Sequence, residues 1–248
     1  MKTGAQLFTV RDFCKTTEDF SESLKKIADI GYKTVQISGT CDYNAEWLRD
    51  ELKKNDLKCV LTHISADKLI NNTKKVADEH DIFDCNRIGL GYLNFEPGQV
   101  TLDKFYDTFT PVVENLHKYG KYFMYHNHAT EFIKQDGKPV LQHMAEHFSP
   151  DKFGFTLDTY WIQFGGGDPA QWIENFAGRV PVIHLKDFSY GFSISALGEG
   201  NINFDRIFAN AEKAGTEYML VEQDDCHGEN PFDCLKRSYE FLKSRGFE

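Results

Sequence analysis

Four short polar groups carry the residues of this chain that could bind a metal ion or move a proton. They are His126-Asn127-His128, Leu157-Asp158, His184-Leu185-Lys186-Asp187 and Val221-Glu222-Gln223. Each follows an apolar run that is typical of a β-strand. Carboxylates and imidazoles at the same end of successive parallel strands converge on one point, and such donors suit Mn, Zn, Co, Ni or Mg. The pattern therefore predicts one divalent metal ion, held without cysteine.

The runs that carry these groups belong to a regular alternation of strands and helices. Eight strands are predicted, at Gly4–Thr9, Thr34–Ser38, Lys58–Ile64, Arg87–Gly91, Tyr122–Asn127, Phe153–Asp158, Val180–Lys186 and Tyr218–Glu222. Helical periodicity lies between them, for example over Phe20–Ile30, Ala45–Asn55, Asp103–Tyr119 and Phe204–Ala214. Helix ends are indicated by Gly31, Gly120 and Gly215, and helix starts by Asp168-Pro169 and Asn230-Pro231.

Eight β/α units in 248 residues predict an α/β fold, a single (β/α)8 TIM barrel that forms one domain over residues 1–248. A doubly wound open sheet is the alternative, but no glycine-rich fingerprint follows the first strand. In a barrel, the C-terminal strand ends face the active site. That end also receives Gln6, Arg11, Gln36 and His63 from the first three strands.

Charge and cysteine content restrict the partners and the compartment. The formal net charge is -10, which opposes binding to nucleic acid or to an anionic membrane surface. The N-terminal residues lack the apolar segment of a signal peptide, and no apolar run approaches the roughly 20 residues of a membrane span. Six scattered cysteines without a CxxC pair suit reduced thiols. We therefore expect a cytoplasmic protein.

The sequence resembles the xylose-isomerase-like barrel superfamily, and within it the sugar phosphate isomerase/epimerase group. The matching segments span nearly the whole chain: Gly4–Asp12, Tyr125–Phe132, Leu157–Trp161, Gly166–Pro169, His184–Asp187, Leu197–Phe204 and Val221-Glu222. The resemblance implies metal ligands at Asp158, His184, Glu222 and one residue of strand five. The family usually has a glutamate there, whereas this chain has His126. Two alternatives stay open: His126 binds the metal, or Glu131 swings in from the following loop.

The resemblance also implies how the centre would act on a sugar. A divalent ion that chelates a carbonyl and its neighbouring hydroxyl makes the adjacent C–H proton removable. Glu222 is then ligand and base together, Lys186 stabilises the oxyanion, and His128 is the catalytic histidine. Substrate contacts are expected from Gln6, His63, Trp161 and Glu199. Arg11 has the fork that binds a phosphate or carboxylate, but no phosphate cradle accompanies it.

The first functional hypothesis is a metal-dependent isomerase or epimerase of a ketose or keto-sugar. The second is a lyase, dehydratase or deglycosidase of 3-keto-sugars or cyclitols, with His128 as general acid. A DNA-repair enzyme is disfavoured, because Trp161 stands where a further histidine ligand would be expected and the chain is acidic. A non-catalytic barrel would lack the ligand set. The expected partner is a small-molecule sugar, with no nucleic acid and no membrane, and the resemblance also allows a homo-oligomer.

Overall fold

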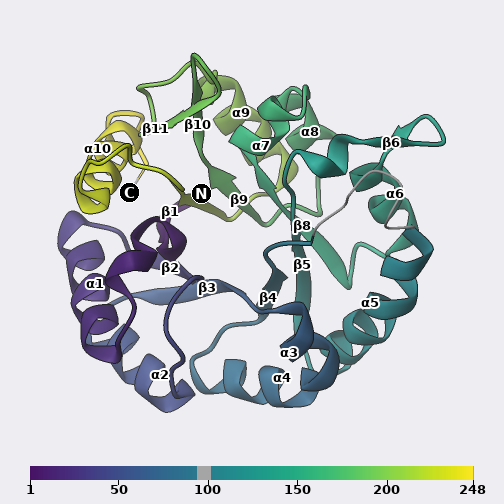
Figure 1. Cartoon of the computed structure of the whole chain (residues 1–248), viewed down its shortest axis with the longest axis horizontal. Helices are drawn as coiled ribbons and strands as arrows, with labels where there is room; N and C mark the ends of the chain where they lie inside the picture. The colour runs from purple at the N-terminus through teal and green to yellow at the C-terminus, as the bar shows by residue number, and fades with distance from the viewer. Residues whose placement is uncertain (94–101, 248) are drawn as a thin grey trace.

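Eight parallel strands close into a barrel in the computed structural model, which describes residues 1–93 and 102–247 (Figure 1). The order around the barrel is β1-β12-β9-β8-β5-β4-β3-β2. These strands are β1 (Lys2–Gln6), β2 (Thr34–Ile37), β3 (Lys58–His63), β4 (Arg87–Leu90), β5 (Tyr122–His126), β8 (Phe153–Asp158), β9 (Val182–Leu185) and β12 (Tyr218–Val221). The predicted TIM barrel is confirmed.

Helices surround the barrel as an outer ring (Figure 1). They are α1 (Thr17–Ile30), α2 (Ala45–Lys54), α3 (Ala66–Asn71), α4 (Thr73–Ile82), α5 (Leu102–Lys118), α6 (Val140–His147), α7 (Thr159–Phe164), α8 (Pro169–Asn175), α9 (Phe204–Ala214) and α10 (Pro231–Ser244), with 3-10 helices η1 (Leu7–Phe13) and η2 (Thr130–Phe132). Two hairpins project from the loops, β6 (Lys134–Gln135) with β7 (Lys138–Pro139) and β10 (Asp187–Ser189) with β11 (Ser193–Ser195). Among the described residues, none of the helices has the length and apolar character to cross a membrane.

Helix boundaries follow the predicted signals at α1, α8, α9 and α10, whereas the first strand ends earlier than predicted. Gly31 and Gly215 lie at helix C-termini with positive φ, and Asp168 and Asn230 cap α8 and α10 before a proline. The predicted strand Gly4–Thr9 is wrong beyond Gln6. The Gln6 side-chain oxygen accepts a hydrogen bond from the Phe8 backbone at 2.6 Å, so the chain turns at once into η1.

Strand periodicity explains why the polar groups collect inside the barrel. The apolar residues that fill the interior include Met124, Val182 and Leu220. Each lies two positions before a polar strand-end residue, namely His126, His184 and Glu222, so each pair shares one side of its strand. The ladders align Leu220 with His184 and Asp158 with His184. The polar residues thus form the top layer of the barrel interior.

The opposite side of each strand packs against the helices. Phe123 and Tyr125 of β5 lie in this outer layer, where the Phe109 ring of α5 contacts Phe123 and the Phe105 ring contacts Tyr125. A buried polar group of the same layer is His80 of α4. Its Nδ1–H donates to the Val76 carbonyl at 2.7 Å, and its Nε2 accepts from the hydroxyl of Thr62 on β3 at the same distance. Burial lowers the pKa of His80 to about 4, so the imidazole is neutral.

Candidate metal centre

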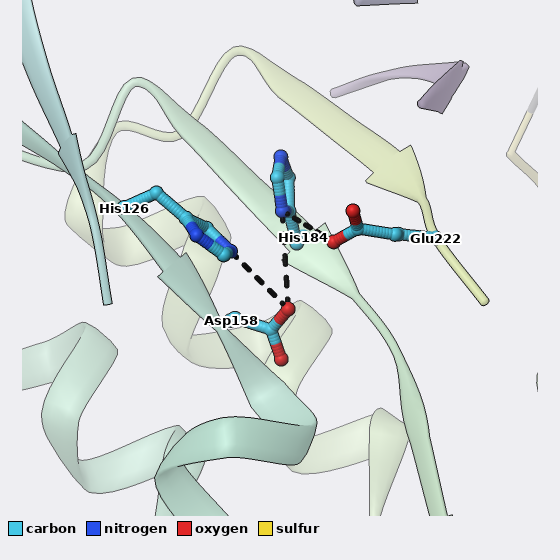
Figure 2. A group of neighbouring side chains, drawn as sticks. All are labelled: His126, Asp158, His184 and Glu222. Atoms are coloured by element: carbon cyan, nitrogen blue, oxygen red, sulfur yellow. Dashed lines mark hydrogen bonds and ion pairs between the residues drawn. The ribbon is translucent and has the colours of Figure 1, made fainter. Parts of the chain in front are cut away.

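Four buried side chains converge at the C-terminal end of the barrel: His126, Asp158, His184 and Glu222 (Figure 2). One potential ligand atom from each lies within 4.8 Å of the others. His184 Nδ1 is 2.9 Å from Glu222 Oε2 and 3.8 Å from Asp158 Oδ2, and His126 Nε2 is 3.4 Å from the same Asp158 oxygen. Two nitrogen and two oxygen donors in this space suit a divalent transition metal.

Hydrogen bonds on the far side of each imidazole leave the facing nitrogen free to bind a metal. His126 Nδ1–H donates to the Gly91 carbonyl at 3.0 Å, and His184 Nε2–H donates to the Gln36 side-chain oxygen at 2.6 Å. The remaining lone pairs then face carboxylate oxygens. His184 Nδ1 and Glu222 Oε2 are buried and only 2.9 Å apart, and with His184 Nε2–H bonded to Gln36 each presents a lone pair to the other. Two acceptors facing each other fit a cation bound between them, so these residues fit a metal ion.

Lys186 is the cation of the site. Its Nζ lies 3.0 Å from Asp158 Oδ2 and 3.0 Å from Glu222 Oε2, the oxygens that also face the imidazoles. A third carboxylate, Asp224, contacts the same ammonium at 3.0 Å. Burial alone would lower the pKa of Lys186, but these three carboxylates raise it well above its usual range. The ammonium is therefore charged and shares the carboxylates with any bound metal.

The charges around the centre shift the pKa values of its carboxylates and imidazoles. Burial would raise the pKa of Glu222, but Lys186 and His184 hold it well below its usual range. Burial would lower the pKa of His126, but Asp158 and Glu222 raise it. Burial and the neighbouring Glu222 raise the pKa of Asp224 to about 6. The carboxylates nearest the imidazoles are thus ionised at neutral pH and available to a cation.

The alternative strand-five ligand, Glu131, is not brought to this point. Its carboxylate accepts hydrogen bonds from the Tyr125 hydroxyl at 2.7 Å and from the His128 backbone N–H at 2.9 Å. Tyr125 belongs to the outer layer of β5, so Glu131 lies behind the strand rather than inside the barrel. The geometry favours His126 as the strand-five member of the set.

Other predicted residues surround the centre. The His63 ring lies 5.2 Å from that of His126 and 5.7 Å from that of His184, and burial with these imidazoles holds the pKa of His63 well below its usual range. The His128 ring lies edge-on to His126 at 4.8 Å, and burial beside that imidazole lowers the pKa of His128 to about 3. The Trp161 ring lies 5.1 Å from that of His128 and 5.5 Å from Lys186 Nζ.

Gln6 joins the centre directly, whereas two other predicted residues do not. The Gln6 amide donates to Glu222 Oε1 at 2.6 Å and so fixes that carboxylate. Glu199 pairs instead with Arg237 at 2.7 Å on the exposed surface, contrary to the expected substrate contact. Arg11 donates to the backbone carbonyls of Phe8 and Asp224, each at 2.9 Å, so its fork fixes loops instead of facing the centre.

Two residues that matter here were not among the predicted site residues. Asp224, two positions after Glu222, contacts Lys186, and its place just beyond a strand end was the available signal. Asp187 accepts hydrogen bonds from the backbone N–H groups of Gly198 and Gly200 at 2.9 Å each, and from those of Phe188 and Ile202. No sequence pattern indicated that this aspartate would hold the loop after β11.

The centre opens into a cavity of about 450 Å³. Its lining includes His126, Lys186 and Glu222 together with the apolar side chains of Phe8, Ile64 and Tyr92. A cavity of this size suits a small organic ligand. The fold and this site together define a (β/α)8 barrel whose mouth holds a carboxylate–imidazole centre.

The chain belongs to the xylose isomerase-like TIM barrel family, whose sequence profile matches residues 24–245. It is 24% identical over 174 residues to inosose dehydratase of Geobacillus kaustophilus, a match that covers 59% of this chain. The match spans 56% of that relative, little more than half its length.

Two solved structures share the fold. A sugar phosphate isomerase/epimerase of Parabacteroides distasonis is 22% identical, with a TM-score of 0.83 over 98% of this chain and 93% of that one. The probable 3-DHS dehydratase of Bacillus anthracis involved in petrobactin synthesis is 17% identical, with a TM-score of 0.78 over 99% of this chain and all of the other. At these identities the likeness shows the fold alone.

Proposed function

We propose that this protein is a divalent-metal-dependent isomerase or epimerase that removes the proton next to the carbonyl of a ketose or keto-sugar. The observation that carries the proposal is the buried convergence of His126, Asp158, His184 and Glu222 on one point, with the Lys186 ammonium 3.0 Å from Glu222 Oε2. Such a centre combines a cation site with a carboxylate base and a proton donor. The sugar isomerase/epimerase of the same fold supports the substrate class.

A divalent ion held by His126, Asp158, His184 and Glu222 would polarise a substrate carbonyl and favour loss of the adjacent proton. Glu222 is ionised and can accept that proton. Lys186 is charged and can donate a hydrogen bond to the oxygen on which negative charge develops. The Gln6 side-chain amide fixes the Glu222 carboxylate by donating a hydrogen bond to its Oε1 atom.

Elimination of a leaving group is the second candidate, because this chain has an imidazole at the strand-five position. His128 is neutral, and its Nδ1 is buried without a hydrogen-bond partner among the described residues. A neutral imidazole with a free nitrogen can first accept a proton and then deliver it to a leaving oxygen. The similarity to an inosose dehydratase supports this alternative for the same initial proton abstraction.

Hydrogen exchange in D2O tests both candidates. The protein is stripped with EDTA, reloaded with Mn or Zn, and incubated with a set of ketohexoses and 3-keto-sugars, and the signal of the C–H group beside the carbonyl is followed by NMR. Metal-dependent deuterium incorporation is expected, and Glu222→Gln should lose at least about 100-fold in rate because the base is removed. Glu199→Gln is the matched control, since that carboxylate lies on the surface.

The products separate the two candidates. An epimer or isomer of unchanged composition supports the isomerase, whereas loss of water or of an aglycone supports the lyase. Protein that binds neither metal, or that shows no exchange with any of these sugars, would contradict the proposal.

A further inference from the structure

One buried carboxylate close to the centre does not face the proposed metal site. Glu131 is fully buried, and its side chain accepts three hydrogen bonds. The Tyr125 hydroxyl donates to Oε1 at 2.7 Å, and the Thr130 hydroxyl and the His128 backbone N–H donate to Oε2 at 3.1 and 2.9 Å. Burying a carboxylate is costly unless such donors surround it, so the donors show which groups Glu131 holds.

The His128 backbone needs a partner because it lies beyond the end of the sheet. The ladder between β5 and β8 ends at His126. Two positions later, the N–H group of His128 donates to Glu131, and its carbonyl accepts from the Asn127 side-chain amide at 3.3 Å. Asn127 is also fully buried, and its side-chain oxygen accepts from the Asp158 backbone N–H at 3.0 Å. Both backbone polar groups of His128 are therefore bound by buried side chains.

The imidazole of His128 has no anchor of that kind. Its Nδ1 is buried without a hydrogen-bond partner among the described residues. Its neighbours are the rings of His126 at 4.8 Å, Trp161 at 5.1 Å and Tyr92 at 5.2 Å. The direction of the Cα–Cβ bond, which the backbone sets, therefore decides where this imidazole points.

We infer that Glu131 is a positioning residue, which fixes the His128 imidazole for proton transfer by holding the His128 backbone. The inference rests on the proposed function for the role of His128, and it gives the buried carboxylate a task other than metal binding. Loss of the carboxylate should free the turn after β5 and leave the four-residue centre in place. His126 stays fixed because it belongs to the strand and because its Nδ1–H donates to the Gly91 carbonyl.

A double-mutant cycle separates this role from a purely structural one. With a sugar on which the Mn-loaded protein acts, Glu131→Ala should lower kcat at least about 30-fold, because a displacement of about 1 Å at a reacting group can cost about 100-fold. KM and the metal Kd should change less than about threefold. In a His128→Gln background, Glu131→Ala should change kcat less than about twofold, since the imidazole that it positions is absent. A carboxylate that only stabilises the fold would give the same loss in both backgrounds.

The conservative variant Glu131→Gln should restore kcat to within about fivefold of the original protein. Its amide oxygen can still accept from the His128 N–H, and its amide nitrogen can donate to the Tyr125 hydroxyl oxygen. This rescue also decides the question if His128→Gln leaves no measurable rate. A Glu131→Gln variant as slow as Glu131→Ala would contradict the positioning role.

NMR of histidine-labelled protein tests the placement without any turnover. In Glu131→Ala, with or without Zn, hydrogen exchange of the His128 backbone amide should be at least about tenfold faster, and the His128 ring signals should shift while those of His184 stay in place. Lys121→Met is the matched control, since Lys121 is buried beside Asp81 away from the centre, and it should leave the His128 signals and kcat unchanged.

Unchanged His128 signals in Glu131→Ala would overturn the inference, as would an equal loss of kcat in both backgrounds or a His128→Gln variant as active as the original protein. Displaced His128 signals in a protein that exchanges no keto-sugar proton would keep the positioning contact and reject the proposed reaction.

Discussion

Replacement of Lys186 by methionine should lower the stability of the metal-free protein and at the same time strengthen metal binding. The ammonium lies 3.0 Å from Asp158 Oδ2 and 3.0 Å from Glu222 Oε2. It therefore neutralises the carboxylates when no metal is present. When a metal is present, the same ammonium repels it across a short distance. Methionine keeps the apolar stem and removes only the charge.

The magnitudes follow from burial, because Lys186 is 1% exposed and Asp158 is fully buried. Removing one partner of a buried ion pair costs about 3–5 kcal/mol. For a chain of this size, each kcal/mol lowers Tm by about 2–4 °C, so a fall of roughly 6–20 °C is expected in EDTA. A divalent ion can replace the lost charge, and metal Kd should decrease by at least about tenfold, equivalent to about 1.4 kcal/mol. The metal-induced rise in Tm should therefore be larger in Lys186→Met than in the original protein.

Thermal unfolding with EDTA and with added Mn or Zn measures both effects, and calorimetry gives Kd. Lys121→Met is the matched control, since Lys121 is also buried and its Nζ contacts Asp81 at 2.6 Å, away from the centre. The control should lose stability without a change in metal affinity. Equal or weaker metal binding by Lys186→Met would refute the view that ammonium and metal share these oxygens.

Three further substitutions test single contacts. His126→Gln should weaken metal binding by at least about 100-fold in calorimetry, whereas Glu131→Gln should leave Kd unchanged; an equal loss in both would restore Glu131 as the ligand. Asp187→Ala removes the acceptor of four backbone N–H groups and should cost about 2–4 kcal/mol in urea unfolding, with faster hydrogen exchange in the loop after β11. A loss below about 0.5 kcal/mol would show that water replaces the carboxylate. His80 has a pKa of about 4 in the folded protein against 6.5 ordinarily, so the unfolded chain binds the extra proton and stability falls as pH drops below 6.5. Between pH 7.5 and pH 5 the loss should be about 2 kcal/mol smaller in His80→Gln, and identical pH profiles would contradict this assignment.

The fold was predictable from the sequence for two reasons. Strands buried on both faces appear as continuous apolar runs, and several helices are bounded by residues that favour helix ends. The run Phe153–Asp158 is buried at every position, and the helix Phe204–Ala214 has the predicted bounds and ends before Gly215, as the sequence indicated. The first strand was predicted too long, since Leu7–Val10 is as apolar as a strand. A hydrogen bond from the Phe8 backbone to the Gln6 side chain decides that turn, and apolar periodicity does not record it.

The candidate site was predictable to the extent that its residues lie at strand ends. Alternation along β9 and β12 places His184 and Glu222 inward, and the sequence shows this directly. Loop residues follow other constraints. Asp187 draws the backbone of Gly198 and Gly200 toward itself, and the side chain of Glu199 between them pairs with Arg237 on the surface. Glu131 accepts a hydrogen bond from Tyr125, whose side chain faces outward from β5. The spacing of residues along the sequence does not indicate this contact.

The histidine on strand five changes the charge balance of the whole centre. With Asp224 ionised, the carboxylates of Asp158, Glu222 and Asp224 face one ammonium and one proposed divalent ion, so three negative charges meet three positive ones. A glutamate in place of His126 would leave an excess negative charge in a buried site, where it would oppose an enediolate oxyanion. With the neutral imidazole, the charge that develops on the substrate in the proposed reaction would meet no net repulsion. In that reaction His126 would let Lys186 act on the reacting oxygen as well as on the proposed metal ligands.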